Sequence, residues 1–164
     1  MNKKDNSFEL AHTLYELLKQ RNMTVATAES CTGGMIGAAL TSVPGVSDCY
    51  GFGVVTYADE AKEKLLGVKH ETLKTHGAVS EETAREMALG AVKLSGASVA
   101  VAVTGVAGPG GATAEKPVGL VYIGFAQKNG ESTAYKNIFK GDRDSVREQT
   151  VNAALKTVIE NIKI

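Results

Sequence analysis

The hydrophobic and polar positions change their spacing repeatedly along the chain, which predicts alternating helices and strands. Apolar residues recur every three or four positions from Phe8 to Leu18, so we expect a helix over 7–21 with Ser7 as its N-cap. Residues 24–29 are β-branched and alternate in polarity, which is typical of a strand. Glycine and proline then divide the rest of the chain into similar short segments.

The same signals define the remaining elements. We expect helices over 35–40, 59–66, 69–76, 80–96 and from Asp142 or Asp144 to about 162, and strands over 50–57, 98–104, 118–127 and 132–139. The run 98–104 is nearly all small and apolar, as in a strand covered on both faces. Asn129-Gly130 is a hairpin signal, so the last two strands should pair antiparallel. The predicted fold class is α/β: one domain over 1–164, a three-layer α/β/α sandwich with a mixed, mostly parallel sheet.

Composition and charge exclude several classes of partner. Lys and Arg together number 18, as do Asp and Glu, and this zero net charge argues against binding nucleic acid by phosphate neutralisation. The apolar runs have only strand length, and the first residues are polar, so we expect a cytoplasmic protein without a membrane partner. Two cysteines and three histidines show no metal-ligand spacing, so no metal site is expected.

The first candidate site is the predicted strand-to-helix turn at Ser30. A serine there is exposed and rigidly held, and the helix start offers unpaired N–H groups to an oxyanion or a phosphate. Cys31, Thr32, Gly33 and Gly34 would then contact the substrate through the main chain, which the two glycines allow a ligand to approach closely. Alternatively, Ser30 or Thr32 merely caps the helix. Cys31 is either a reactive thiol at a helix start or, as we favour, a small buried hydrophobic residue.

The second candidate pair, Tyr57 and Lys62, follows the end of the next strand. Sites gather at the carboxyl ends of parallel strands, so both residues could face Ser30. A serine nucleophile needs a base, and a buried lysine can serve because desolvation disfavours its charged form. Tyr57 would relay the proton or hydrogen-bond the amine. The alternatives are that Lys62 and Lys64 are both surface residues, or that Lys64 is the base.

The third candidate is the glycine-rich loop after Thr104. Gly105, Gly108, Gly110 and Gly111 lie just past a predicted buried strand and suit a main-chain cradle for an anion. The loop is neither a P-loop nor a dinucleotide-binding fingerprint, because the required spacing is absent. The alternative interpretation is a flexible connection without a ligand.

Charged residues outside these segments receive simpler interpretations. Arg143, at the start of the last helix, could reach a phosphate group. Arg147 is expected to be solvated, and His76 is expected to serve a helix end.

Six segments, taken in order, resemble the CinA C-terminal domain family. They are AESCTGG (28–34), VTYADEAK (55–62) with LLGV (65–68), HGAVS (76–80), TGVAGP (104–109), KPVG (116–119) and GDR (141–143). The resemblance extends over nearly the whole chain from Phe8. The chain departs from the family pattern at Ala58-Asp59, where Ser-Asn is frequent, and at Ala112, where a second glycine is usual.

The resemblance implies a reaction. Characterised members are nicotinamide-nucleotide amidases, which convert nicotinamide mononucleotide and water to nicotinate mononucleotide and ammonia in the pyridine nucleotide cycle of NAD metabolism. It also implies an α/β/α fold and neither a metal nor another cofactor. The nucleophile would be Ser30, the lysine Lys62, the tyrosine Tyr57 and the hydroxyl after the buried strand Thr104.

The sequence leaves several alternatives open. The main one is a non-catalytic nucleotide-binding or regulatory module that uses the same pocket for a small-molecule nucleotide. A metal-dependent nucleotide hydrolase is disfavoured because no carboxylate or histidine cluster is present. A homo-oligomer is also left open, since small domains of this kind often form symmetric assemblies.

Overall fold

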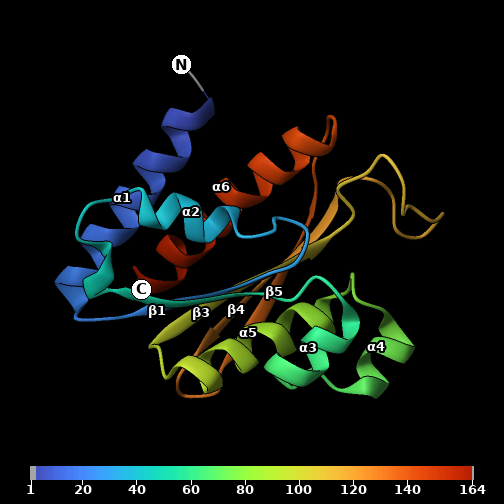
Figure 1. The fold of residues 1–164 in the computed structure, drawn as a ribbon, viewed down its shortest axis with the longest axis horizontal. Helices are drawn as coiled ribbons and strands as arrows, with labels where there is room; N and C mark the ends of the chain where they lie inside the picture. The colour runs from blue at the N-terminus through green and yellow to red at the C-terminus, as the bar shows by residue number, and fades with distance from the viewer. Residues whose placement is uncertain (1–2, 164) are drawn as a thin grey trace.

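The computed structural model describes residues 3–163, in which a five-stranded sheet lies between two helical layers (Figure 1). One layer consists of α1 (Lys3–Arg21), α2 (Met35–Thr41) and α6 (Arg143–Ile162). The other consists of α3 (Asp59–Leu66), α4 (His70–His76) and α5 (Glu81–Ser95). The predicted three-layer α/β/α sandwich is therefore confirmed.

The sheet has the strand order β2-β1-β3-β4-β5. Strand β1 pairs in parallel with β2 and β3, whereas β4 pairs antiparallel with β3 and β5, so β4 alone runs against the others in the described sheet. This arrangement confirms a mixed, mostly parallel sheet closed by a hairpin. The strands are β1 (Val25–Glu29), β2 (Tyr50–Val55), β3 (Val99–Gly105), β4 (Leu120–Gln127) and β5 (Ser132–Ile138).

The element boundaries differ from the prediction in a few places. Helix α1 already includes Lys3, since no glycine or proline interrupts 3–7, so Ser7 lies inside the helix and is not its N-cap as expected. Strand β2 ends two residues early because the Thr56 carbonyl accepts a hydrogen bond from a lysine side chain instead of continuing the ladder. Strand β4 begins at Leu120, since Gly119 has φ 91° and a Cβ there would lie 1.9 Å from the Phe139 carbonyl oxygen. The 3₁₀ turn Val46–Asp48 was not predicted.

Strand β3 divides the core into two parts. Val99, Val101 and Val103 pack with the α1 and α6 side, whereas Ala100 and Ala102 pack with the α5 side. This alternation confirms the prediction of a strand buried on both faces, because successive side chains point to opposite faces of a sheet. The alanine side has little room, so α5 lies close to the sheet.

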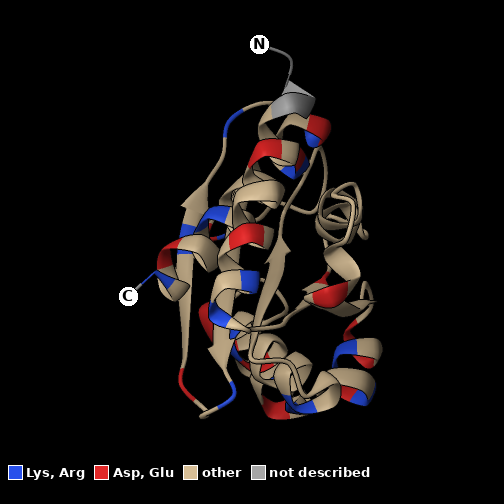
Figure 2. Ribbon diagram, turned by 90° about the vertical axis from the view of Figure 1, so that its left-hand side faces the viewer, with Lys and Arg blue, Asp and Glu red and all other residues tan. Residues whose placement is uncertain are grey.

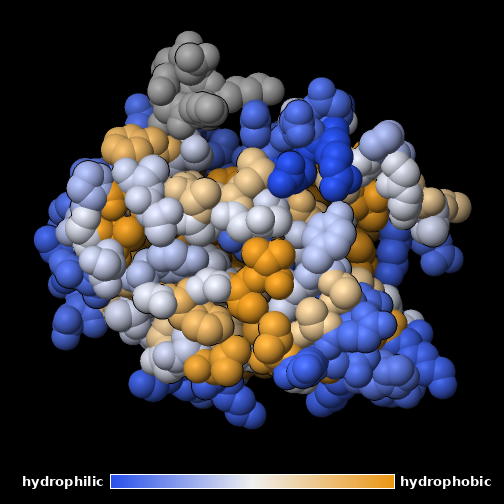
Figure 3. All heavy atoms as spheres, in the orientation of Figure 1, coloured by the Kyte–Doolittle hydropathy of each residue, from blue (hydrophilic) through white to orange (hydrophobic). Residues whose placement is uncertain are grey.

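The surface carries mixed charge. Figure 2 shows Lys and Arg interspersed with Asp and Glu along the helices of both layers. Figure 3 shows apolar side chains gathered near the middle of one face, with hydrophilic side chains around them. Within residues 3–163, no helix combines the length and the apolarity that crossing a bilayer requires.

Candidate active site

Ser30 lies on a sharp turn at the carboxyl end of β1. Its main-chain N–H bonds to the Val103 carbonyl of β3 at 3.1 Å, and Gly33 N–H returns to the Ser30 carbonyl at 3.1 Å. Gly33 and Gly34 have φ of 59° and 105°, a left-handed conformation that glycine adopts readily, and α2 starts directly after them. The predicted strand-to-helix turn is confirmed, but the expectation that its serine is exposed is wrong, because Ser30 packs beside the buried Lys62 and is only 8% exposed.

A buried carboxylate that the sequence analysis did not single out occupies the start of α2. Glu29 is 2% exposed and accepts hydrogen bonds from Thr32 Oγ1 at 2.6 Å, Ile36 N at 2.8 Å and Gly37 N at 3.0 Å. Glu29 thus satisfies N–H groups that a helix start leaves unpaired, and no Ser30 or Thr32 cap is needed. The sequence analysis expected unpaired N–H groups at this helix start that could bind an anion. That expectation is wrong for the Ile36 and Gly37 N–H groups, which Glu29 already binds.

Lys62 reaches the serine from α3. Its side chain is 1% exposed, and Nζ donates to Ser30 Oγ at 3.1 Å, to the Thr56 carbonyl at 2.7 Å and to the Tyr57 carbonyl at 3.3 Å. Burial lowers the pKa of this amine, and the nearby negative charge of Asp59 opposes the shift only in part. The surface interpretation of Lys62 is wrong; it is Lys64 that is exposed.

Tyr57 and Arg143 meet at the mouth of the site. Arg143 Nη1 donates to the Gly108 carbonyl at 2.8 Å, and Nη2 donates to the Tyr57 phenolic oxygen at 3.3 Å. Tyr57 is 63% exposed and reaches Lys62 through its main-chain carbonyl, whereas the sequence interpretation expected the phenol to make that contact. Arg143 therefore links the end of β2 to the glycine-rich loop.

Thr104 and the following loop form another wall. The Thr104 hydroxyl is buried and donates to the Ala78 carbonyl at 2.8 Å, which leaves its lone pairs free to accept. The loop is tied at its base, where Val106 N–H bonds to the Leu120 carbonyl and Gly119 N–H bonds to the Val106 carbonyl, both at 2.8 Å. The loop is therefore held in place at its base and by Arg143, which disfavours the alternative interpretation of a flexible connection.

These segments enclose a cavity of about 270 Å³. The predicted residues on its wall are Ser30, Cys31, Tyr57, Lys62, Thr104, Gly105, Gly108, Gly110, Gly111 and Arg143. Thr32, Gly33 and Gly34 are not on that wall, because their turn leads away into α2. Ala78 and Val79, which precede α5, contribute to the wall without having been predicted, although they belong to the recognised segment 76–80.

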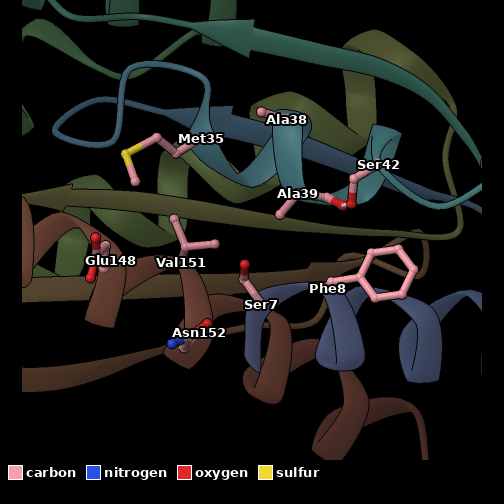
Figure 4. A pocket seen from close by; sticks show the side chains of 9 residues that line it. All are labelled: Ser7, Phe8, Met35, Ala38, Ala39, Ser42, Glu148, Val151 and Asn152. Atoms are coloured by element: carbon pink, nitrogen blue, oxygen red, sulfur yellow. Dashed lines mark hydrogen bonds between the residues drawn. The ribbon is translucent and has the colours of Figure 1, made fainter. Parts of the chain in front are cut away.

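A larger groove of about 510 Å³ lies elsewhere, between α1, α2 and α6. In Figure 4, Phe8 and Ser7 come from α1, Met35 from α2, and Val151 from α6. Among the residues whose side chains the structure describes, its wall is mostly apolar and contains neither lysine nor arginine. Size alone therefore does not identify the reactive site, and the smaller cavity holds the nucleophile candidate and the buried amine.

Cys31 shares the turn with Ser30 but differs in reactivity. Burial raises the pKa of its thiol to about 11, against the charges of Arg147 and Lys62, which favour the thiolate. A thiol with this pKa stays protonated near neutral pH and is a poor nucleophile. The structure thus favours the interpretation of Cys31 as a small buried residue, although the residue is part of the cavity wall.

Arg147 is a residue whose environment sequence analysis misjudged. The expectation of a solvated side chain is wrong, because Nε donates to the Cys31 carbonyl at 3.1 Å and Nη2 to the Thr32 carbonyl at 3.2 Å. The available signal was its spacing from Arg143, since residues four apart lie on one face of a helix. His76, by contrast, ends α4 as expected.

The fold and site define an α/β protein with a buried serine–lysine pair at the carboxyl ends of parallel strands. The chain belongs to the CinA C-terminal domain family, whose model matches residues 7–162. It is 47% identical over 150 residues to the nicotinamide-nucleotide amidohydrolase PncC of Escherichia coli K12, covering 92% of this chain and 91% of that protein. A CinA-like protein of Endomicrobium trichonymphae is 52% identical over 157 residues, or 93% of this chain.

Solved structures share the same fold. The crystal structure of the competence/damage inducible protein CihA from Agrobacterium tumefaciens matches with a TM-score of 0.93 at 44% identity, covering 97% of this chain and 96% of that one. A CinA superfamily protein from Escherichia coli matches with a TM-score of 0.91 at 34% identity, over 98% and 93% of the two chains.

Some relatives are much longer than this chain. It spans 38% of the Clostridium tetani relative, 40% of the Clostridium acetobutylicum relative and 36% of the Endomicrobium protein. The family thus contains proteins of different lengths around one shared unit.

Proposed function

We propose that this protein is a nicotinamide-nucleotide amidohydrolase that uses Ser30 as nucleophile and Lys62 as base. The observation that carries the proposal is the buried Lys62 amine, 3.1 Å from Ser30 Oγ with a lowered pKa. Support for the substrate class comes from the 47% identical Escherichia coli protein that bears this activity in its name. The substrate would be nicotinamide mononucleotide, and the products would be nicotinate mononucleotide and ammonia.

The surroundings of Lys62 suit a neutral amine. A neutral amine has two N–H bonds, which the Thr56 and Tyr57 carbonyls can accept, and one lone pair left for the Ser30 hydroxyl. In the protonated state the same nitrogen donates to Ser30 Oγ instead. Loss of the proton therefore reverses this hydrogen bond and turns Lys62 into an acceptor for the serine proton.

In the proposed reaction, Ser30 Oγ attacks the carboxamide carbon as its proton moves to Lys62. The carbonyl oxygen becomes an oxyanion, stabilised by main-chain N–H groups of the Ser30 turn or of the loop after Thr104. Lys62 then returns the proton to the departing nitrogen, the carbon–nitrogen bond breaks, and ammonia leaves an acyl-enzyme. Water, deprotonated by the same amine, attacks the ester, releases the carboxylic acid and restores Ser30.

The nucleotide phosphate needs a separate subsite. Arg143 and the main-chain N–H groups near Gly108, Gly110 and Gly111 are the candidates, since they share the cavity with Ser30. A guanidinium binds phosphate with paired hydrogen bonds. In this proposal Tyr57 and Gly108 hold Arg143 in place until the substrate arrives.

The test is ammonia release from nicotinamide mononucleotide, nicotinamide and nicotinamide riboside. We expect turnover of the mononucleotide by the wild type, and a loss of several orders of magnitude in Ser30→Ala, as for other covalent acyl-transfer sites. Cys31→Ala should stay active. Near-wild-type turnover by Ser30→Ala would remove the serine from the mechanism.

The same experiment separates the alternative function. A non-catalytic nucleotide-binding module would bind the mononucleotide, as calorimetry can show, without releasing ammonia from any amide offered.

A cytoplasmic location and a homo-oligomeric state stay predictions, to be checked by cell fractionation and light scattering.

A further inference from the structure

The guanidinium of Arg147 lies against the turn that carries Ser30. The side chain extends from the second turn of α6, is half-buried, and donates to two successive peptide carbonyls, those of Cys31 and Thr32. A Cβ at Gly33 would lie 3.5 Å from Nη2, so the guanidinium also packs on the next residue of the turn. Arg147 does not line the cavity around Ser30.

These two hydrogen bonds set the orientation of the peptide groups after Ser30. In a planar trans peptide the C=O and N–H point in opposite directions. With the Cys31 and Thr32 carbonyls turned toward α6, the N–H groups of Thr32 and Gly33 must point away from α6. The Gly33 N–H indeed bonds back to the Ser30 carbonyl at 3.1 Å.

Two opposite charges hold the turn from different sides. The Glu29 carboxylate accepts from main-chain N–H groups of α2, while the Arg147 guanidinium donates to main-chain carbonyls of the turn itself. The segment that follows Ser30 is therefore held both at its carbonyls and at the N–H groups of the helix into which it leads. Burial raises the pKa of the Cys31 thiol, and the positive charge of Arg147 opposes this shift in part because it favours the thiolate.

We propose that Arg147 is a positioning residue: by holding the Cys31 and Thr32 carbonyls it fixes the turn after Ser30 and so keeps Ser30 Oγ within hydrogen-bonding distance of Lys62 Nζ. The inference rests on the proposed function, because it assigns Arg147 a role through Ser30. Arg147 acts without touching the substrate, so its loss changes kcat and leaves KM nearly unchanged.

The first test compares Arg147→Met and Arg147→Lys with Lys156→Met, which removes an exposed cation from the same helix. We expect both Arg147 variants to lose kcat by roughly 10- to 100-fold, since misplacing a reacting group by about 1 Å costs up to about 10²-fold. The Lys variant keeps the charge but lacks the planar fork that serves two carbonyls. A change in KM with kcat retained would overturn the proposal.

The second test is chemical rescue. Millimolar guanidinium chloride should restore part of the kcat of Arg147→Ala, because the small cation can occupy the vacated position between the two carbonyls. Methylammonium chloride at equal ionic strength is the control and should restore less. Rescue distinguishes a positioning role from a purely structural one, which added guanidinium would not repair; equal rates with both salts would contradict the proposal.

The third test makes the result independent of the natural substrate. A fluorophosphonate probe forms a phosphorus–oxygen bond with Ser30 Oγ, the phosphorus–fluorine bond breaks, fluoride leaves, and the serine proton passes to Lys62. We expect at least tenfold slower labelling in the Arg147 variants at unchanged melting temperature. Equal labelling rates would overturn the role of Arg147.

The outcomes also separate the two proposals. If the wild type is labelled at Ser30 but releases no ammonia from nicotinamide mononucleotide, the proposed substrate is wrong, and the labelling comparison still decides the role of Arg147. If the wild type is neither labelled at Ser30 nor active, both proposals are wrong.

Discussion

At the residue scale, the central feature is a buried lysine whose nitrogen contacts neutral oxygens. Transfer of a charged amine into the protein is costly, and within residues 3–163 the hydrogen-bond acceptors at Lys62 Nζ are the Ser30 hydroxyl and the Thr56 and Tyr57 carbonyls. The cost appears as a lowered pKa, which supplies a neutral amine at lower pH than an exposed lysine would. A position that is unfavourable for a charge is thereby favourable for a base.

The pH dependence of activity follows from this shift. In the proposed mechanism Lys62 acts as the neutral amine, and burial lowers its pKa, so kcat/KM should rise with pH and level off with an inflection below the ordinary lysine value of 10.5. A pH–rate profile of ammonia release checks this, with Lys64→Met as a control that keeps the wild-type profile. An inflection at or above 10.5 would contradict the assignment of Lys62 as base.

The same shift predicts a pH-dependent stability difference. The folded-state pKa lies below the unfolded value, so between the two values the unfolded chain binds more protons, and the free energy of unfolding of the wild type rises with pH. In Lys62→Met this contribution is absent. The stability of Lys62→Met relative to the wild type should therefore fall as pH rises from neutral toward 10. Urea unfolding at several pH values measures it, and a gap that does not change with pH would contradict the shift.

At the scale of elements, the short helix α2 depends on the strand that precedes it. Its N-cap residue is a glycine without a side-chain hydrogen bond, and the Glu29 carboxylate from β1 takes over the capping contacts. The contact between Glu29 of β1 and the start of α2 thus holds the turn that carries Ser30 in place. Arg147 adds a contact from the last helix of the chain.

Replacing Glu29 by Gln tests this internal cap. The amide nitrogen of Gln cannot accept, so at least one buried donor loses its partner, and we expect a loss of about 1–3 kcal/mol in the free energy of unfolding. Kinetics should show a lower kcat as the turn loosens. Glu60→Gln, at an exposed position in the first turn of α3, is the control and should change stability by less than about 0.5 kcal/mol. Equal effects of both substitutions would contradict the capping role.

Helix α5 also depends on close packing. A Cβ at Gly90 would lie 1.9 Å from the Leu66 carbonyl oxygen at the end of α3. Helix propensity favours Ala over Gly by about 1 kcal/mol, but we expect the clash to outweigh it and to destabilise Gly90→Ala by about 1–3 kcal/mol. Gly51→Ala, with nothing within 4 Å, is the control in a chemical unfolding experiment. A stabilised Gly90→Ala would show that α3 and α5 are not so tightly packed.

At the scale of the whole molecule, the candidate site exists only in the assembled fold. Its wall draws on the ends of β1 and β3, the start of α3, the residues before α5 and the start of α6. These segments converge because the carboxyl ends of parallel strands meet at one edge of the sheet. Ligand binding should therefore be coupled to global stability and not to a single element.

Thermal unfolding of Ser30→Ala with nicotinamide mononucleotide measures this coupling. Ligand at one hundred times its dissociation constant stabilises the native state by about 2.7 kcal/mol, which for a chain of this size raises Tm by roughly 5–10 °C. Arg143→Met in the same background should show a smaller shift, because the proposed phosphate contact is lost. No shift at saturating ligand would contradict a preformed nucleotide site.

The sequence alone determined the order and type of the elements and the places where the chemistry gathers. The signals that predict these elements are alternating and helical spacing of apolar residues, helix caps and glycine turns. Each depends only on residues close together in the sequence, so it can be recognised without the tertiary structure. They placed Ser30 on a turn, predicted the hairpin after β4 and marked 98–104 as a buried strand. Family resemblance added the ordering of the site segments, including 76–80.

Only the tertiary structure decided which side chains meet. It selected Lys62 over Lys64, gave Glu29 the start of α2, and turned Arg147 onto the Ser30 turn. Spacing along a helix defines which residues share a face, but not what lies opposite that face. Burial and hydrogen bonding across elements depend on packing between segments far apart in the chain, and this packing sets both the pKa of the amine and the geometry around the serine.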